Sequence, residues 1–206
     1  MGRYTGAACK KCRRAKEKLF LKGDKCYSAK CPVKKRAYPP GQHGKAPSRL
    51  SEYGIRLREK QKARQIYGIS ERQFENYFDK AARSRGVKGT NLLVLLERRL
   101  DNIVYRLGLC KSRREARQFV KHGHVMVKGK KMNVPSYQMR TGEKLVVLEH
   151  SAPRVKKLLE EGAERKPPEW LELDKSKLEA KVLRYPQRDE IDTLVEDHLI
   201  IEYYSR

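Results

Sequence analysis

Four cysteines fall within the first 31 residues of this chain, as Cys9-x2-Cys12 followed by Cys26-x4-Cys31. Each short pair can wrap one side of a cation, and the 13 residues between the pairs let the chain return to complete a tetrahedron. Lysine and arginine beside the thiols are expected to lower their pKa and to favour the thiolate, which is the form that binds metal. The spacing therefore predicts a structural metal ion held by these four side chains.

The identity of the bound group is less constrained than its ligands. Four thiolates accept either zinc or a four-iron cluster, and the short paired spacing favours zinc. A disulfide pair or a chance spacing is the alternative to any metal. The N-terminal residues contain no apolar run like that of a secretory signal, which favours a reducing compartment and free thiols. We expect one structural Zn²⁺ ion, with an iron–sulfur cluster as the less favoured cofactor.

Positive charge is spread over most of the chain. Lysine and arginine total 49 against 25 aspartate and glutamate residues, a formal net charge of +24, and the cations run from Arg3 to Lys157. Self-repulsion of this size is best neutralised by a polyanion, and nucleic acid is the commonest one. A merely solubilising surface and an anionic membrane are the alternatives. No stretch has membrane-spanning length, and no basic face carries an exposed Trp or Phe edge, so no membrane partner is expected.

Residues 1–45 have few apolar residues in a periodic pattern and form a basic arm. The arm ends in the sequence YPPGQHG (residues 38–44), where the prolines fix an extended backbone and the glycines permit close approach to another surface. We expect a rigid loop that presents Gln42 and His43 as hydrogen-bond donors. A plain linker is the alternative.

Three helices are expected between the arm and Gly108. Residues 51–67 carry a stripe of Arg56, Lys60 and Arg64, which either follows a phosphate backbone or is simply solvated. A capping box at residues 70–73 begins the second helix. Leucine, isoleucine and valine residues between positions 92 and 107 predict a third, amphipathic helix.

The segment SRREARQFVKHGH (residues 112–124) predicts a helix with one basic face. Ser112 and Glu115 form a capping box, and the helix N-terminus adds a dipole that favours phosphate. After Gly123 the apolar residues alternate with a period of two, which predicts a small antiparallel sheet. The cations on the basic face of the helix are Arg113, Arg114, Arg117 and Lys121.

These patterns predict an α+β protein: a zinc-bound N-terminal arm, a small mostly helical domain, and a nucleic-acid-binding domain of helices packed on a small antiparallel sheet. The arm covers residues 1–45, the helical domain residues 46–90, and the nucleic-acid-binding domain residues 91–189. Because residues 46–90 are few for an independent core, we expect residues 190–206 to complete the helical domain. The apolar run at residues 199–204 would return there as a strand or turn.

Seven motifs, in order along nearly the whole chain, carry a family resemblance: YPPGQHG (38–44), LREKQK (57–62), IYGISERQF (66–74), RLDNIVYRLG (99–108), SRREARQ (112–118), VKHGH (120–124) and IEYYSR (201–206). Together they closely resemble the bacterial family of small-subunit ribosomal protein four. Some members lack the cysteines, and this sequence is similar to the branch that keeps all four and binds zinc. It departs from the family at Ala37, Ala63 and Gln65, which affects local packing and one RNA contact rather than the assignment.

The resemblance implies direct binding to the 5′ domain of small-subunit ribosomal RNA at a multi-helix junction, early in assembly of the subunit body. It also implies a cytoplasmic place in the small subunit beside the fifth small-subunit protein, and an influence on decoding accuracy. Many bacterial members repress their own messenger RNA, which is a further implied partner. Residues 92–149 resemble the small RNA-binding module named after the family, so its basic helix faces become RNA-docking surfaces.

Two other functions are alternatives to RNA binding. The same module occurs in pseudouridine synthases, and Arg99-Leu100-Asp101 echoes their active-site triplet, but Asp101 lies in a helical pattern where a solvated residue is the simpler expectation. No large domain remains to bury a flipped base, so we expect no enzyme and no catalytic residues. A DNA-binding zinc protein is the second rival, and the metal segment lacks the apolar helix that would enter a major groove.

The expected RNA-binding residues come from the arm, the Pro/Gly loop, the first long helix and the basic helix. Cys110 has no nearby partner in the sequence and is expected to be a partly buried structural thiol rather than a nucleophile or a ligand. The RNA-binding set is Arg3, Arg13, Arg14, Lys34, Lys35, Arg36, Gln42, His43, Arg56, Arg58, Lys60, Lys62, Arg64, Ser112, Arg113, Arg114, Arg117 and Lys121.

Overall fold

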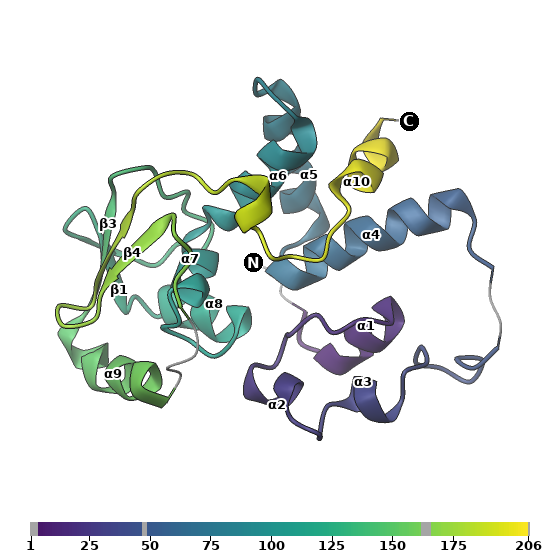
Figure 1. The fold of residues 1–206 in the computed structure, drawn as a ribbon, viewed down its shortest axis with the longest axis horizontal. Helices are drawn as coiled ribbons and strands as arrows, with labels where there is room; N and C mark the ends of the chain where they lie inside the picture. The colour runs from purple at the N-terminus through teal and green to yellow at the C-terminus, as the bar shows by residue number, and fades with distance from the viewer. Residues whose placement is uncertain (1–3, 47–48, 162–165, 206) are drawn as a thin grey trace. The chain divides into compact units, whose positions relative to one another are not determined.

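A computed structural model describes residues 4–46, 49–161 and 166–205 (Figure 1). Its contacts divide the chain into two compact units, residues 1–92 with 193–206, and residues 93–192. The combination of helices with a small antiparallel sheet confirms the predicted α+β class. In the described ranges, no helix is long and apolar enough to cross a membrane.

The first unit begins with three short helices in the basic arm. They are α1 (Ala8–Ala15), α2 (Asp24–Tyr27) and α3 (Pro32–Lys35). Pro32 opens α3, where a proline costs no backbone hydrogen bond. Glu17, just after α1, pairs with Lys62 at 3.2 Å, and α1 contacts the long helix that follows the arm. The arm is therefore packed against the helical part of its own unit.

Helices α4 (Glu52–Tyr67) and α5 (Glu71–Arg83) follow, and α6 (Lys88–Glu97) begins in this unit. Ser51 and Ser70 cap α4 and α5 by accepting hydrogen bonds from backbone N–H groups three residues later, as the capping pattern predicted for Ser70. Gly68 ends α4 with a φ of 64°, a conformation that glycine adopts without strain.

The C-terminal apolar run is a helix, α10 (Asp197–Tyr204), so the expectation of a strand or turn is wrong. Ile200 is fully buried, and Tyr204 stacks on Phe78 of α5 with ring centroids 4.3 Å apart. These two side chains are four residues apart and share one helical face, which is the spacing that a helix needs to bury both. Figure 1 shows α10 lying along α4, in keeping with the contacts between the two helices.

In the second unit, the predicted helix over residues 92–107 is broken in two. Helix α6 ends at Glu97, and α7 (Leu100–Arg106) begins after Arg99, whose ψ of 137° is extended rather than helical. The break is held by pairing with a distant segment: Met139 N–H donates to the carbonyl of Arg98, and Leu100 N–H donates to that of Tyr137. Hydrophobic periodicity continues through the break, so the sequence pattern alone did not reveal it.

Helix α8 (Arg113–Lys121) leads into the antiparallel sheet, whose strands in the described residues run in the order β2-β1-β3-β5-β4. Val125 lies opposite Met132 on one neighbouring strand and opposite Val147 on the other. The strands are β1 (Val125–Val127), β2 (Lys130–Met132), β3 (Lys144–Val147), β4 (Leu171–Asp174) and β5 (Glu179–Val182). The small sheet predicted after Gly123 is thus present, and strands from the C-terminal third extend it.

One hydrophobic core joins the helices and the sheet of the second unit. It includes residues of α7, α8 and the strands, together with Trp170, which is 1% exposed. Helix α9 (Ala152–Glu161) contributes Val155, and short 3₁₀ turns lie at Glu149–Ser151 and Arg188–Glu190. Helix α8 buries Ala116, Phe119 and Val120 and leaves its polar face on the outside, whereas α7 is buried from Leu100 to Tyr105.

Candidate nucleic-acid interface

The four arm cysteines lie on or beside the three short helices. Cys9 and Cys12 are on α1, Cys26 is on α2, and Cys31 directly precedes α3. Cys12, Cys26 and Cys31 are buried, and all four are free thiols rather than disulfides. The backbone N–H of Lys22 donates to the Cys26 sulfur at 3.3 Å. The three short helices therefore bury three of the four cysteines in an otherwise polar, basic segment.

The expected lowering of the thiol pKa values is wrong for two of these cysteines. Burial raises the pKa of Cys12 and of Cys26, and the neighbouring thiols add to the rise, against the lowering effect of backbone N–H groups on each sulfur. At these two sulfurs, burial and the neighbouring thiols outweigh the charge of the lysine and arginine side chains of the arm. The mutual influence of the four thiols shows that they lie near one another.

The arrangement of metal donors bears on the expected zinc site. Within the described residues, no group of three or more His, Cys, Asp or Glu side chains is placed so as to hold a metal ion. The donor chemistry itself fits a soft ion, because four sulfurs and backbone N–H donors to sulfur are the features of thiolate zinc sites. The zinc expectation stays a prediction on these observations.

The cations of the arm divide into one structural residue and several exposed ones. Arg13 donates to the carbonyls of Tyr38 and Pro39 at 3.0 and 3.3 Å, and so fixes the start of the Pro/Gly loop. The loop exposes both Gln42 and His43, as its composition predicted. Arg3 lies outside the described residues. Of the arm cations expected to bind RNA, those that are exposed are Arg14, Lys34, Lys35 and Arg36.

The predicted basic stripe on α4 is wrong as an open surface. Lys60 is 3% exposed, lies 2.5 Å from Glu71 and sits over the ring of Tyr203, because α10 covers this face. Lys62 is also buried, between Glu17 and Glu59. Buried cations are tolerated only when they are paired in this way. Two more members of the stripe have carboxylate partners: Arg56 pairs with Glu52 and Glu202, and Arg64 pairs with Glu71.

The basic face of α8 is split between internal and external roles. Ser112 caps the helix by accepting from the Glu115 N–H, as predicted. Arg117 reaches back to Asp101 at 3.2 Å, and Arg113 donates to the Asn102 side chain at 2.8 Å, so neither simply projects into solvent. The cations of this helix that are fully exposed are Arg114 and Lys121.

Asp101 is not the solvated residue that the helical pattern predicted. Its side chain is 5% exposed and accepts from Arg99 at 3.0 and 2.6 Å, in addition to Arg117. Arg99 is itself fully buried. The carboxylate thus neutralises two guanidinium groups at the break between α6 and α7, which is a structural role and not that of a catalytic acid.

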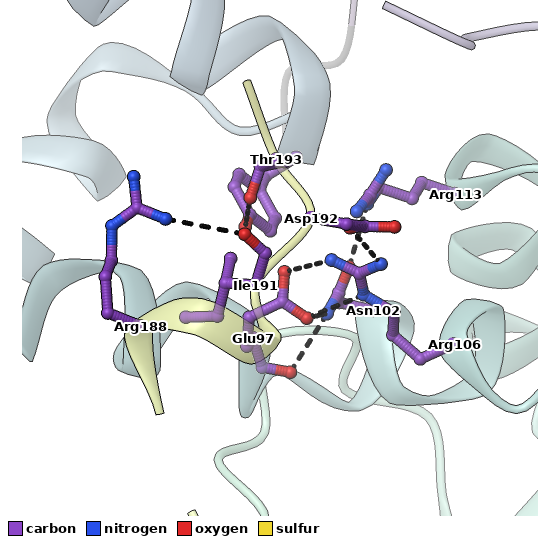
Figure 2. A network of polar contacts seen from close by, with 9 residues as sticks. Glu97, Asn102, Arg106, Arg113, Arg188, Ile191, Asp192 and Thr193 are labelled. Atoms are coloured by element: carbon purple, nitrogen blue, oxygen red, sulfur yellow. Dashed lines mark hydrogen bonds and ion pairs between the residues drawn. The ribbon is translucent and has the colours of Figure 1, made fainter. Parts of the chain in front are cut away.

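A second buried network joins α6, α7 and α8 (Figure 2). Glu97, 1% exposed, accepts from both nitrogen forks of Arg106 at 2.8 Å and from Asn102 at 2.7 Å. The other end of Asn102 accepts from Arg113, and Arg106 also pairs with Asp192. Sequence reasoning missed Glu97, although an acid inside the apolar run of residues 92–107 was a usable signal. The network orients Arg113 at the N-terminus of α8.

Sequence reasoning also missed two cations beside the loop. Lys16 follows α1, and Lys45 follows the YPPGQHG motif with its ammonium 5.3 Å from the Tyr38 ring. Both are exposed and line a groove with the loop. Their position next to a Pro/Gly-rich loop was the available signal. Cys110, by contrast, is 2% exposed, and burial raises its pKa, which confirms the expected buried thiol.

Comparison with known proteins places this geometry in a family. Residues 3–97 match the ribosomal protein S4/S9 N-terminal domain, and residues 98–145 match the S4 domain. The chain is 56% identical over 208 residues to a small ribosomal subunit protein uS4 from Desulforamulus reducens, and 57% identical over 209 residues to one from Syntrophomonas wolfei. Both alignments cover the whole of each chain.

The chain belongs to the uS4 family of ribosomal proteins. A relative from Dictyoglomus turgidum is 53% identical over 206 residues, again with full coverage of both chains. Members of this family are structural ribosomal proteins and not enzymes, in agreement with the expected absence of catalysis. The S4 domain match covers α7, α8, β1, β2 and the start of β3, and so includes the split basic face of α8.

Proposed function

We propose that this chain is a structural protein of the cytoplasmic small ribosomal subunit that binds the 5′ domain of small-subunit ribosomal RNA at a multi-helix junction. It nucleates assembly of the subunit body and contributes to translational accuracy. The observation that carries the proposal is full-length similarity to uS4 proteins in a chain with a net charge of +24 and exposed cations in both units. Such a charge excess is the electrostatic footprint of a phosphate-binding protein.

Recognition in this proposal depends on the shape of the folded RNA. Arg114 and Lys121 contact phosphates from the outer face of α8, while Arg113 and Arg117 are held in place by Asn102 and Asp101. The arm and its loop add a second set of exposed cations on the other unit. Arginine forks bind phosphate oxygens in pairs, which gives orientation as well as affinity. A basic face on each of the two units suits a junction, where several RNA helices converge.

The neighbours of the chain follow from the same proposal. They are other small-subunit ribosomal proteins, the fifth one in particular, and its own messenger RNA where autoregulation operates. The exposed tyrosine and isoleucine side chains of the first unit, Tyr53 and Ile55, are available for a protein neighbour.

We also propose that the arm binds one structural zinc ion through Cys9, Cys12, Cys26 and Cys31. The support is the mutual proximity of the four thiols, the burial of three of them, and the backbone N–H donor at Cys26. Zinc would supply folding free energy by replacing the repulsion of crowded thiolates with metal–sulfur bonds. An iron–sulfur cluster is the less favoured occupant of the same ligands.

The test is the affinity of the purified chain for a folded 5′-domain RNA and for duplex DNA of equal length at physiological salt. Tighter binding to the RNA by about a hundredfold or more is expected, with a log–log salt slope of about −6 to −7 if about eight phosphates are neutralised. Equal affinity for the two nucleic acids would contradict specific RNA binding. A slope near −2, which corresponds to roughly two phosphate contacts, would contradict the electrostatic mechanism.

A further inference from the structure

A basic groove lies in the first unit between α1, the loop and α4. It has a volume of about 770 Å³ and is lined by residues 37–46 together with Arg14, Lys16 and Arg58. Its four lysine and arginine residues, which are Arg14, Lys16, Lys45 and Arg58, come from three separate segments of the chain. No described aspartate or glutamate lines it. A concave site of this size with one sign of charge concentrates an anionic ligand.

Arg58 differs from its neighbours on α4. Arg56, Lys60, Lys62 and Arg64 each pair with at least one carboxylate, as described above. Arg58 forms no ion pair with any described Asp or Glu, and neither does Arg14. Burial, with the nearby charge of Arg14, lowers the pKa of Arg58. Two like charges are therefore held close together without a counter-charge from the described chain, which favours an anion between them.

The loop that lines the groove is held in a fixed conformation by its own contacts. Arg13 holds the carbonyls of Tyr38 and Pro39, and its guanidinium lies 5.0 Å from the Tyr38 ring centroid. A Cβ atom added at Gly44 would lie 2.0 Å from the Pro39 carbonyl oxygen, so the loop folds back on itself at a point that only glycine fits. A site formed before the ligand arrives loses less conformational entropy on binding.

We propose that this groove binds a sharp turn of an RNA backbone, where successive phosphates crowd together. The inference rests on the proposed RNA-binding function and identifies the RNA feature that this unit recognises. A regular helix spreads its phosphates along a broad surface, and a concave site cannot surround them. A tight turn instead presents a convex group of phosphates, which Arg14 of α1 and Arg58 of α4 can bind while Lys16 and Lys45 neutralise the remainder.

The test compares two charge-matched double variants of the full-length chain on the folded 5′-domain RNA. Arg14→Gln with Arg58→Gln removes the unpaired groove cations, and Lys80→Gln with Arg83→Gln removes two exposed cations of α5 in the same unit. The groove variant is expected to lose at least about tenfold in affinity and about 1.5 from the salt slope, whereas the α5 variant loses less than about threefold. Hydroxyl-radical footprinting should show lost protection at one non-helical backbone turn, only in the groove variant.

Each outcome separates this inference from the proposed function. Normal RNA affinity and an intact footprint in the groove variant would overturn the groove assignment and leave RNA binding standing, whereas absence of RNA binding in the unsubstituted chain would remove both. Binding of inorganic tripolyphosphate is a second measurement. Saturable binding that the groove substitutions abolish, with RNA binding unaffected, would assign the groove to a small polyphosphate instead. Should the arginine variant unfold by circular dichroism, Lys16→Gln with Lys45→Gln tests the same groove through exposed residues.

Discussion

Arg117 of α8 lies 3.2 Å from Asp101 of α7, and this contact ties the basic helix to the helix break beneath it. Asp101 also neutralises Arg99, which is fully buried. Asp101→Asn should therefore lower the free energy of unfolding by about 3 kcal/mol, because it leaves a buried guanidinium without its counter-charge. Urea denaturation measures the change. Asp192→Asn is the control, since Asp192 is mostly exposed and its pair with Arg106 should contribute less than about 1 kcal/mol. Equal stability of the two variants would contradict the structural role of Asp101.

The four cations of α8 should fall into two classes on substitution. Arg113→Ala with Arg117→Ala removes partners of Asn102 and Asp101, so it should reduce stability as well as RNA affinity. Arg114→Ala with Lys121→Ala removes exposed charges only and should reduce RNA affinity with a melting temperature within about 2 °C of the unsubstituted chain. Thermal melts beside RNA titrations give both quantities. Identical melting of the two double variants would show that the inward-reaching contacts are energetically unimportant.

Helix α10 should stabilise the long helices of its unit. Tyr204→Ala removes the ring that stacks on Phe78 and Phe74, and we expect a loss of about 2 kcal/mol in the free energy of unfolding. Tyr204→Phe keeps the ring and loses only the hydroxyl contact with Glu71, so its loss should stay below about 1 kcal/mol. Hydrogen exchange of α4 and α5 amides locates the effect. Unchanged protection in Tyr204→Ala would mean that α10 is not part of this core.

Metal binding by the arm should be pH-dependent. Zinc binds the thiolate, and burial raises the pKa of Cys12 and Cys26, so protons compete for these sulfurs and the zinc affinity should fall as the pH is lowered from 8 to 6. Native mass spectrometry should show one zinc that is lost on denaturation. Cys9→Ser with Cys12→Ser should abolish it, while Cys110→Ala, which alters a buried thiol of the other unit, should retain it. Iron with inorganic sulfide, or no metal at all, would refute the zinc arm.

Local sequence rules accounted for the elements whose signals are local. Ser70 and Ser112 cap the helices that their spacing predicted, and the alternation after Gly123 became strands. These features depend on hydrogen bonds within a few residues or on a simple period, so the neighbouring residues contain the necessary information. The family, too, was recognisable from contiguous motifs.

The roles of individual cations could not be predicted in this way. Lys60 and Arg58 are two residues apart in a highly basic helix, yet Lys60 is buried against Glu71 and α10 while Arg58 faces a groove without a described carboxylate partner. Likewise Arg114 is exposed whereas Arg113 reaches Asn102. Charge counting assigns all of these residues to RNA, because composition does not say which carboxylates the fold brings near.

The sequence by itself determined that this is a basic, mixed helix-and-sheet protein with paired thiols near its start, since these properties follow from composition, period and spacing, and its contiguous motifs identified the uS4 family. Tertiary structure decided where α6 stops, that the C-terminal run is a helix on α4, and which cations stay unpaired. Each of those outcomes depends on partners far away in the chain, such as Tyr137 for the helix break and Glu202 for Arg56. Long-range pairing is set by packing, and no local pattern encodes it.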